Sequence, residues 1–373
     1  MKNKIEYIYI HVPFCLSKCG YCSFYSERFA PDLKRKYLRF LQEEIAFCQQ
    51  KFELKPKTIY FGGGTPSLLS GKEIDAILHN FDLTETREIT LEANPVCITP
   101  KYTETISQTK INRISLGIQS FDDSELQLLG RLHNGKQAEN ALRLLRENGF
   151  SNLSFDLIYG LPKQTINDLR FSLEKFIELA PPHISTYCLS LEPDVPLYFM
   201  KSQIPHDEQV AEFYFLIRET LIDAGYRQYE ISNFAQPGMA SQHNLCYWND
   251  QFYLGLGPAA AGYLFNGNHR IRYTNPADLQ EYFQQIEAKI IFPEAEEITE
   301  TEQEKEFIFL ALRKTEGLNL SEFQNKFGEN FREKYKLIIE KYQRVKLLEL
   351  TDEYVKLLPE AYFVSNEILA EFV

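Results

Sequence analysis

Three cysteines lie within eight positions near the start of the chain, with the spacing Cys15-x3-Cys19-x2-Cys22. In a reducing compartment such a group indicates metal or redox chemistry more than a disulfide framework. Thiolates hold iron–sulfur clusters, and a [4Fe–4S] cube usually takes four of them. Because this motif supplies only three, one iron would stay open to another ligand. The spacing therefore predicts a [4Fe–4S] reaction centre rather than a plain electron carrier.

A zinc site is the main alternative for the same cysteines. Structural zinc takes four ligands, and His11 is the nearest candidate for the fourth. A fortuitous group of cysteines is a further alternative. Covalent haem attachment of the c type is disfavoured, because Cys22 is followed by Ser23 and not by histidine.

The first half of the chain alternates strand-like and helix-like patterns. Strands are expected at Ile5–Val12, Thr58–Phe61, Glu88–Ala93, Arg113–Gln119, Leu153–Tyr159 and His183–Leu191. Helices are expected between them at Pro31–Phe52, Gly71–Asn80, Pro100–Gln108, Lys136–Asn148 and Ile166–Leu179. This order implies a parallel sheet with right-handed crossovers. The predicted fold class is therefore α/β, a partial TIM-type (β/α) barrel.

Residues suited to chemistry follow these strands at the same end. The cysteines come after the first strand and a glycine run, Gly62 to Thr65, comes after the second. Glu92 ends the third strand, Gln119 ends the fourth and Asp156 lies in the fifth. Because parallel strands end at one rim of such a fold, these residues are expected to form a single functional face.

The rest of the chain predicts two further parts, so that three domains are expected at 1–205, 206–293 and 294–373. The mostly acidic stretch from Glu294 to Glu306 marks the second boundary. The middle part holds a helix, Asp207–Ala224, and a strand, Tyr229–Phe234. The last part resembles a winged helix, with helices at Glu302–Lys314, Leu320–Phe327 and Asn330–Lys346 and a hairpin at Leu347–Leu350 and Tyr354–Leu358.

The formal net charge of −12 argues against broad nucleic-acid binding, which depends on a basic surface. No nucleic-acid partner is therefore expected, even for the winged-helix-like part. The apolar run from Ile5 to Phe14 is short and interrupted by Glu6 and His11, unlike a secretory signal. No apolar stretch approaches the roughly 20 residues that cross a bilayer. We therefore expect a cytoplasmic protein.

Two motifs together resemble those of the radical-SAM superfamily. The cysteine spacing, with the aromatic Tyr21 before the last cysteine, is similar to the superfamily signature. The run Gly62-Gly63-Gly64-Thr65-Pro66-Ser67 resembles its glycine motif, in which exposed backbone approaches the amine of S-adenosylmethionine (SAM). The resemblance implies that SAM occupies the open iron and that one electron can cleave it.

Further motifs resemble the branch of oxygen-independent coproporphyrinogen oxidase and its relatives. They are Tyr9–Cys15, Leu91–Pro95, Gly117–Phe121, Gly130–His133 and Asp156–Pro162. Carried over residue by residue, the SAM contacts would be Tyr9, Gly63, Gly64, Thr65, Glu92, Gln119, Arg131 and Asp156. Carboxylates suit ribose hydroxyls, and an arginine suits the SAM carboxylate. No catalytic residue is assigned.

The segment His243-Asn244-Leu245-Cys246-Tyr247-Trp248 is similar to the His-Asn-x-x-Tyr-Trp motif of HemW-type haem chaperones. That resemblance implies a protein that binds haem and passes it to acceptors such as respiratory enzymes, with an electron donor for the cluster. An imidazole offers iron an axial nitrogen, and the aromatic pair offers apolar surface to a porphyrin. The segment shows no packing periodicity, which favours a site at His243 over a core position. Cys246 is an alternative ligand.

The rival is an enzyme, an oxygen-independent coproporphyrinogen III dehydrogenase that converts two propionates to vinyls. Two departures weigh against it. The oxidase continues its motif as Cys-x-Cys, whereas here Cys22 is followed by Ser23-Phe24. The oxidase also carries an N-terminal extension ahead of its cluster, whereas here Cys15 lies close to the start of the sequence. Whether SAM is turned over stays open at this point.

Overall fold

The computed structural model describes residues 2–372, and the chain divides into two compact units. The first unit comprises the chain up to Phe213 together with Phe252–Glu297, and the second comprises Tyr214–Gln251 and the chain from Ile298. The segment 206–293, which the sequence set apart as a domain, is divided between both units. The boundary near 297 falls within the acidic stretch that marked it in the sequence.

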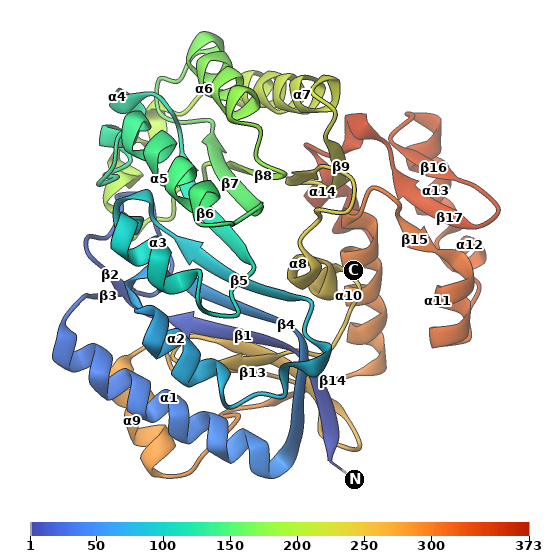
Figure 1. Ribbon diagram of the computed structural model, residues 1–373. Coiled ribbons are helices and arrows are strands. Elements are labelled where there is room, and N and C mark those ends of the chain that lie inside the picture. Colours follow the sequence, from blue (N-terminus) through green and yellow to red (C-terminus); the bar gives the residue numbers. More distant parts are fainter. Residues whose placement is uncertain (1, 373) are drawn as a thin grey trace. The chain divides into compact units, whose positions relative to one another are not determined.

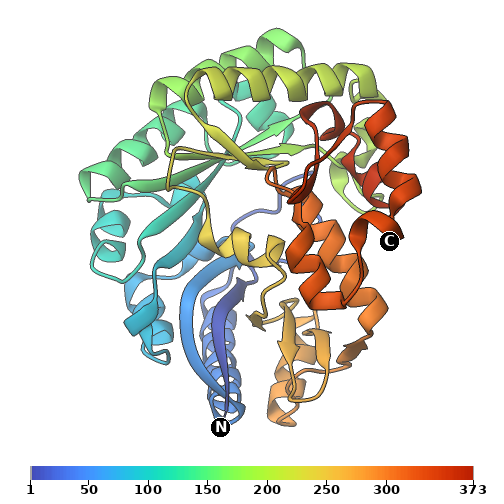
Figure 2. The ribbon, with the colours of Figure 1, turned by 90° about the vertical axis from the view of Figure 1, so that its right-hand side faces the viewer.

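The first unit is built on seven parallel strands in the order β11-β1-β4-β5-β6-β7-β8. Figures 1 and 2 show this sheet as a curved wall. Its strands are β1 (Asn3–Val12), β4 (Phe52–Gly63), β5 (Glu88–Ala93), β6 (Arg113–Gln119), β7 (Asn152–Tyr159), β8 (His183–Cys188) and β11 (Leu254–Leu256). The expected partial (β/α) barrel is confirmed.

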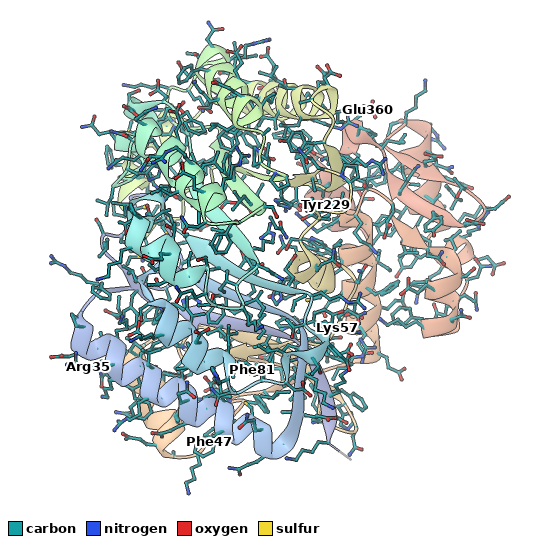
Figure 3. All side chains as sticks on the ribbon, in the orientation of Figure 1. Arg35, Phe47, Lys57, Phe81, Tyr229 and Glu360 are labelled. Carbon is teal, nitrogen blue, oxygen red and sulfur yellow. The ribbon has the colours of Figure 1, made fainter. Side chains whose placement is uncertain are left out.

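Helices cover one face of this sheet, as Figure 1 shows for α1, α2, α3 and α5. They are α1 (Pro31–Lys51), α2 (Gly71–Leu78), α3 (Pro100–Ile106), α4 (Asp123–Leu128), α5 (Gly135–Glu147) and α6 (Ile166–Leu179). Capping boxes begin α2 at Ser70, α5 at Asn134 and α6 at Thr165. Arg35, labelled in Figure 3, projects from the exposed side of α1.

The two faces of the strands differ in chemistry, because side chains alternate along each strand. Ile8, Ile59 and Ile114 are fully buried toward the helices. The other face carries polar groups, and the register pairs Glu92 with Ser115 and Asp156 with Ser185. Neighbours at one register point to the same side of a parallel sheet, so the polar residues of successive strands are gathered on the inner face.

Two expected strand bounds in the first unit are wrong, and one strand of its sheet was not predicted. β4 begins at Phe52 rather than Thr58, because Pro56 and the charged residues around it conceal an alternation in which Phe52 and Leu54 are buried. β8 ends at Cys188 instead of Leu191. The strand β11 was not predicted, since three residues with a central glycine carry too little pattern. Beyond it, β12 (Ala261–Phe265) pairs with β13 (Arg270–Thr274), and α9 (Leu279–Glu287) follows.

In the second unit, the predicted strand Tyr229–Phe234 is instead a hairpin of β9 (Arg227–Glu230) and β10 (Asn233–Ala235). The Glu230 carboxylate accepts hydrogen bonds from the Ser232 backbone N–H and from Asn233, which closes the turn. The predicted helix Asn330–Lys346 breaks at Tyr335 into α12 (Phe331–Lys334) and α13 (Lys336–Arg344).

The remaining elements of the second unit agree with a winged-helix-like module. Its three-stranded sheet has the order β15-β17-β16, with the predicted hairpin as its wing. The elements are α8 (Gln242–Trp248), α10 (Glu300–Arg313), β15 (Leu318–Asn319), α11 (Leu320–Phe327), β16 (Leu348–Leu350), β17 (Tyr354–Leu357) and α14 (Ser365–Leu369). Helix α7 (Asp207–Asp223) contains the boundary between the units. Across residues 2–372, no helix is long and apolar enough to cross a membrane.

Candidate cofactor and haem sites

The cysteine motif forms a closed loop directly after β1. Cys15 ends the short strand β2 (Phe14–Cys15), which pairs with β3 (Glu27–Arg28). The Phe29 N–H also donates to the Cys15 carbonyl at 2.8 Å. These bonds hold both ends of the loop and leave the three thiols partly exposed. Burial raises the pKa of Cys22, and the neighbouring charges of Cys19 and Cys15 raise it further.

The described residues contain no group of three or more His, Cys, Asp or Glu side chains with the geometry of a single-ion site. The zinc alternative, which needs four converging ligands, therefore gains no support from the side chains. His11 is buried, and its ring nitrogens are bonded to the Tyr9 hydroxyl and to the Tyr25 carbonyl, both at 3.1 Å. Three thiolates remain the expected protein ligands of a [4Fe–4S] cube with one open iron.

Two distant side chains donate to the cysteine sulfurs. The Thr65 hydroxyl lies 3.5 Å from Cys15 Sγ, and Arg131 Nη1 lies 3.4 Å from Cys19 Sγ. Arg131 also donates through Nη2 to the Gly117 carbonyl, which orients the guanidinium beside the loop. Such donors stabilise thiolate charge. The sheet therefore brings residues 50 and 112 positions away to the cysteine loop.

The glycine run is required by close packing at the end of β4. A Cβ at Gly63, where φ is +112°, would lie 2.8 Å from the His11 ring, and one at Gly64 would lie 2.7 Å from the Phe14 carbonyl. Only glycine tolerates both the left-handed backbone and this approach. The Gly64 N–H bonds to the Val12 carbonyl at 2.9 Å. The run thus lies against the start of the cysteine loop with its backbone partly exposed.

Two carboxylates on the inner face have strongly perturbed acidity. Burial raises the pKa of Glu92 to about 7, although the Tyr60 hydroxyl donates to its Oε1 at 2.8 Å. Burial raises the pKa of Asp156 to about 6, and the positive charge of Arg113 opposes the rise. Carboxylates that bind protons this readily lack full stabilisation of their charge, so a polar or cationic ligand would fit between them.

Three further predicted SAM contacts, Tyr9, Tyr21 and Gln119, belong to the first unit, as the cysteines and the two carboxylates do. Tyr9 stacks on Tyr60 with ring centroids 6.1 Å apart, and Tyr21 packs against the apolar cluster that includes Leu129 and Leu197. Gln119 has φ of +75°, and its buried Oε1 accepts no hydrogen bond from residues 2–372. An unpaired buried acceptor is costly unless a ligand satisfies it. The donor set therefore fits a ligand that carries amine and hydroxyl groups.

Two residues of this site were missed by the sequence reasoning. Tyr60 bonds Glu92, and Arg113 is 2% exposed with an Nε that has no hydrogen-bond partner among the described residues. The sequence could have indicated Arg113, since it lies at an odd-numbered position of β6, like the polar residues Ser115 and Gln119. A charged residue on the inner parity of an otherwise apolar strand indicates a polar interior.

The predicted haem residue His243 belongs to the second unit, whereas the residues above belong to the first. The expectation that this segment lacks packing periodicity is wrong, because it forms α8 and buries His243 and Cys246 one turn apart. His243 is 1% exposed, and its Nε2 is 2.9 Å from the Tyr247 hydroxyl. The two rings meet edge to face with centroids 5.1 Å apart. The imidazole is thus covered in this conformation.

Two family models match the chain. Residues 9–176 match the radical SAM superfamily, and residues 298–364 match the HemN C-terminal domain. The first covers β1 through most of α6 and includes all three motif cysteines. The second covers most of the winged-helix-like module.

Curated relatives match over two thirds or more of the chain, and two of the three given below match over nearly its whole length. "Heme chaperone HemW" of Lactococcus lactis is 34% identical over 100% of this chain and 98% of its own length. The Bacillus subtilis protein of that name is 32% identical over 98% of both chains. The Escherichia coli protein of that name is 37% identical over 68% of this chain and 69% of its own.

A solved structure shares the fold. Coproporphyrinogen III oxidase (HemN) from Escherichia coli, a radical SAM enzyme, superposes with a TM-score of 0.86 over 99% of this chain and 90% of that chain, at 21% identity. This likeness concerns the fold alone. The full-length identity to the curated relatives decides the family, and the chain belongs to the HemW family of the radical SAM superfamily.

Proposed function

We propose that this chain is a haem chaperone, which binds haem and delivers it to acceptor proteins. The observation that carries the proposal is 34% identity over the whole chain to a relative named as a heme chaperone. The His-Asn-x-x-Tyr-Trp segment, residues 243–248, is present in full. The chain carries a [4Fe–4S] cluster and SAM as its cofactors, in keeping with its superfamily.

In this proposal Cys15, Cys19 and Cys22 hold the cluster, which supplies an electron when it is reduced. The SAM contacts come from one edge of the sheet and the loops after it. They are Tyr9, Tyr21, Gly63, Gly64, Thr65, Glu92, Gln119, Arg131 and Asp156. Arg131 suits the carboxylate of SAM, while Glu92 and Asp156 suit its hydroxyl or amine groups. The orphaned Oε1 of Gln119 would gain the donor that it lacks.

His243 is the proposed haem ligand through an imidazole nitrogen, and Cys246 is the alternative. Because the His243 side chain is buried and bonded to Tyr247, the imidazole has to leave this position before it can meet iron. Haem binding at α8 therefore requires a local rearrangement of the helix. The apolar rings of Tyr247 and Trp248 would then cover porphyrin surface.

The dehydrogenase reading is less supported. Its strongest argument is the fold that the chain shares with a coproporphyrinogen III oxidase, and one fold hosts many activities. The residue after Cys22 is Ser23, where the oxidase continues its cysteine motif. Whether the chaperone itself cleaves SAM is a separate question.

The proposal includes partners and a compartment. An electron donor is needed to reduce the cluster, and the haem acceptors would be proteins such as membrane respiratory enzymes. A cytoplasmic location is proposed because a site of three reduced thiols is maintained in a reducing compartment. A nucleic-acid partner is not proposed, because the net charge is −12.

Haem titration of anaerobically reconstituted protein tests the proposal. A Soret band shifted from that of free haem is expected, with about one haem per chain if His243 is the main ligand. His243→Ala should lose or displace the band while the cluster absorption persists, whereas the exposed histidine variant His79→Ala should leave both unchanged. Consumption of coproporphyrinogen with SAM and reductant, without haem binding, would replace the chaperone by the dehydrogenase.

A further inference from the structure

The end of the haem motif, Trp248, and the two residues after it contact cationic side chains of the C-terminal module. The Arg313 guanidinium lies over the Trp248 ring, 5.0 Å from its centroid. Lys314 Nζ donates to Asn249 Oδ1 at 2.7 Å. Both cations lie at the end of α10, which packs beside α8 within the second unit. The last residue of the motif and the residue after it are therefore held by the last residue of α10 and the residue after that helix.

A third tie involves the next residue. Lys326 of α11 pairs with the carboxylate of Asp250, whose side chain is 3% exposed. The ammonium also lies 4.5 Å from the Phe307 ring centroid and 5.8 Å from that of Phe327. Screening by water is weak at such a site, so the pair is held more firmly than an ion pair in solvent.

The backbone at this point also depends on outside support. Asp250 has φ of +50°, a left-handed conformation that is unfavourable for a residue with a side chain. Its N–H donates to the Tyr247 carbonyl at 3.0 Å, and the Gln251 N–H donates to the Cys246 carbonyl at 3.0 Å. The turn thus ends α8 tightly, and Lys326 holds the carboxylate of the strained residue.

A buried carboxylate also acts on the guanidinium of the Arg313–Trp248 contact. Burial lowers the pKa of Arg313, and the charge of Glu230, a fully buried residue of β9, opposes that shift. Arg313 Nε and Trp248 Nε1 have no hydrogen-bond partner within residues 2–372. The ring face and the carboxylate therefore position this part of the guanidinium without direct hydrogen bonds to either nitrogen.

We propose that Arg313, Lys314 and Lys326 are positioning residues for the haem motif, an inference that rests on the proposed function. They act through Trp248, Asn249 and Asp250. Helix α8 has seven residues, so fixing its last turn fixes where His243 and Tyr247 stand. The C-terminal module thereby sets how readily the imidazole is presented to haem.

The experiment compares wild type with the double variant Arg313→Met/Lys326→Met, in which packing volume is largely kept and charge is lost. Lys336→Met is the matched control, because its side chain is 69% exposed and contacts only the helix neighbour Glu340 among the ion pairs. Trp248 is the only tryptophan of the chain, so its emission reports on the ties without haem. Haem affinity and the Soret maximum report on the motif.

We expect the double variant to shift Trp248 emission, to change haem Kd about tenfold and to move the Soret maximum. Lys336→Met should change none of these. The single variant Lys326→Met should show part of the effect, whereas Lys326→Arg, which keeps the positive charge, should behave like the wild type. If the double variant does not fold, as judged by its thermal transition, Asn249→Ala replaces it, since that change removes only the Lys314 bond. A two- to threefold change in Kd is then expected.

Two failures are distinguishable. A shifted Trp248 emission with unchanged haem Kd and Soret maximum would overturn the positioning role and leave the chaperone intact. Absence of His243-dependent haem binding in the wild type would refute the proposed function, and the positioning role with it. An unchanged Trp248 emission in the folded double variant would show that the ties do not hold α8, and would also overturn the inference.

Discussion

Two regions differ in how ready they are for a ligand. One is the cysteine edge of the first unit, which comprises the loop of Cys15, Cys19 and Cys22 with the neighbouring Arg131 and Gln119, and the other is helix α8 of the second unit. At the cysteine edge, the three thiols are partly exposed, and Gln119 presents a buried acceptor without a donor. At α8, His243 is buried and its nitrogen is already bonded to Tyr247. The first region therefore presents groups that are open to a ligand, whereas under the proposed function the second would have to open before it could bind haem.

The largest expected effect separates the two regions completely. Replacing Cys15, Cys19 and Cys22 together with alanine should abolish the brown chromophore and the roughly four bound irons, because these three thiolates are the proposed ligands of the cluster. His243-dependent haem binding should persist, since α8 contains none of these residues. Cys188→Ala, which changes an exposed thiol outside the motif, should keep the full iron content. A triple variant with a complete cluster would place the site elsewhere.

The next effect tests the cysteine edge. Glu92→Ala and Arg131→Ala should each weaken SAM binding by about 1.5–3 kcal/mol, the cost of a lost charge-assisted hydrogen bond. Iron content should remain in Glu92→Ala, whereas Arg131→Ala also removes the hydrogen bond to Cys19 Sγ, so its iron content is measured before its SAM affinity is compared. Isothermal titration under anaerobic conditions measures the affinity, and Arg143→Ala, a surface residue of α5, serves as the control. Equal SAM affinity in all four proteins would mean that the pocket is misplaced.

The acidity of Glu92 predicts an effect on stability. Its folded pKa of about 7 lies above the ordinary value of 4.5, so the folded state binds this proton more tightly than the unfolded state. Stability should therefore fall as pH rises from about 4.5 to 7, by about 3 kcal/mol for this group. Glu92→Gln should flatten that dependence in urea titrations without SAM. An unchanged slope would show that Glu92 is ionised in the free protein.

The smallest effect concerns the covered imidazole. Tyr247→Phe removes the hydroxyl that holds His243 Nε2, a bond worth about 0.5–1.5 kcal/mol. Haem should consequently bind about two- to tenfold more tightly, with the same Soret maximum. Tyr335→Phe, which removes a hydroxyl bonded to Glu304, provides a control of equal size in the same unit. Weaker binding by Tyr247→Phe would indicate that the hydroxyl contacts haem directly.

Sequence reasoning located the strands best where their ends are signalled locally. β5 and β6 match their expected bounds, since each alternates apolar and polar residues and is flanked by charged or turn-forming residues. The hairpin at Glu230 was read as one strand, because its turn depends on a carboxylate that bonds its own neighbours. The short β11 was missed, since its place beside β1 is set by pairing with a strand more than two hundred residues earlier.

By itself the sequence determined the order of strands and helices and predicted a cofactor site at the cysteine loop, because the cysteine spacing, the glycine run and the strand patterns are local. Only the tertiary structure decided that Thr65 and Arg131 reach the cysteine sulfurs and that His243 is covered. It also decided that Tyr60 bonds Glu92 and that the charge of Arg113 acts on Asp156. These outcomes depend on register and on packing between distant segments. Arg313 and Lys326 contact the end of α8 across 65 and 76 positions, a separation over which periodicity carries no information.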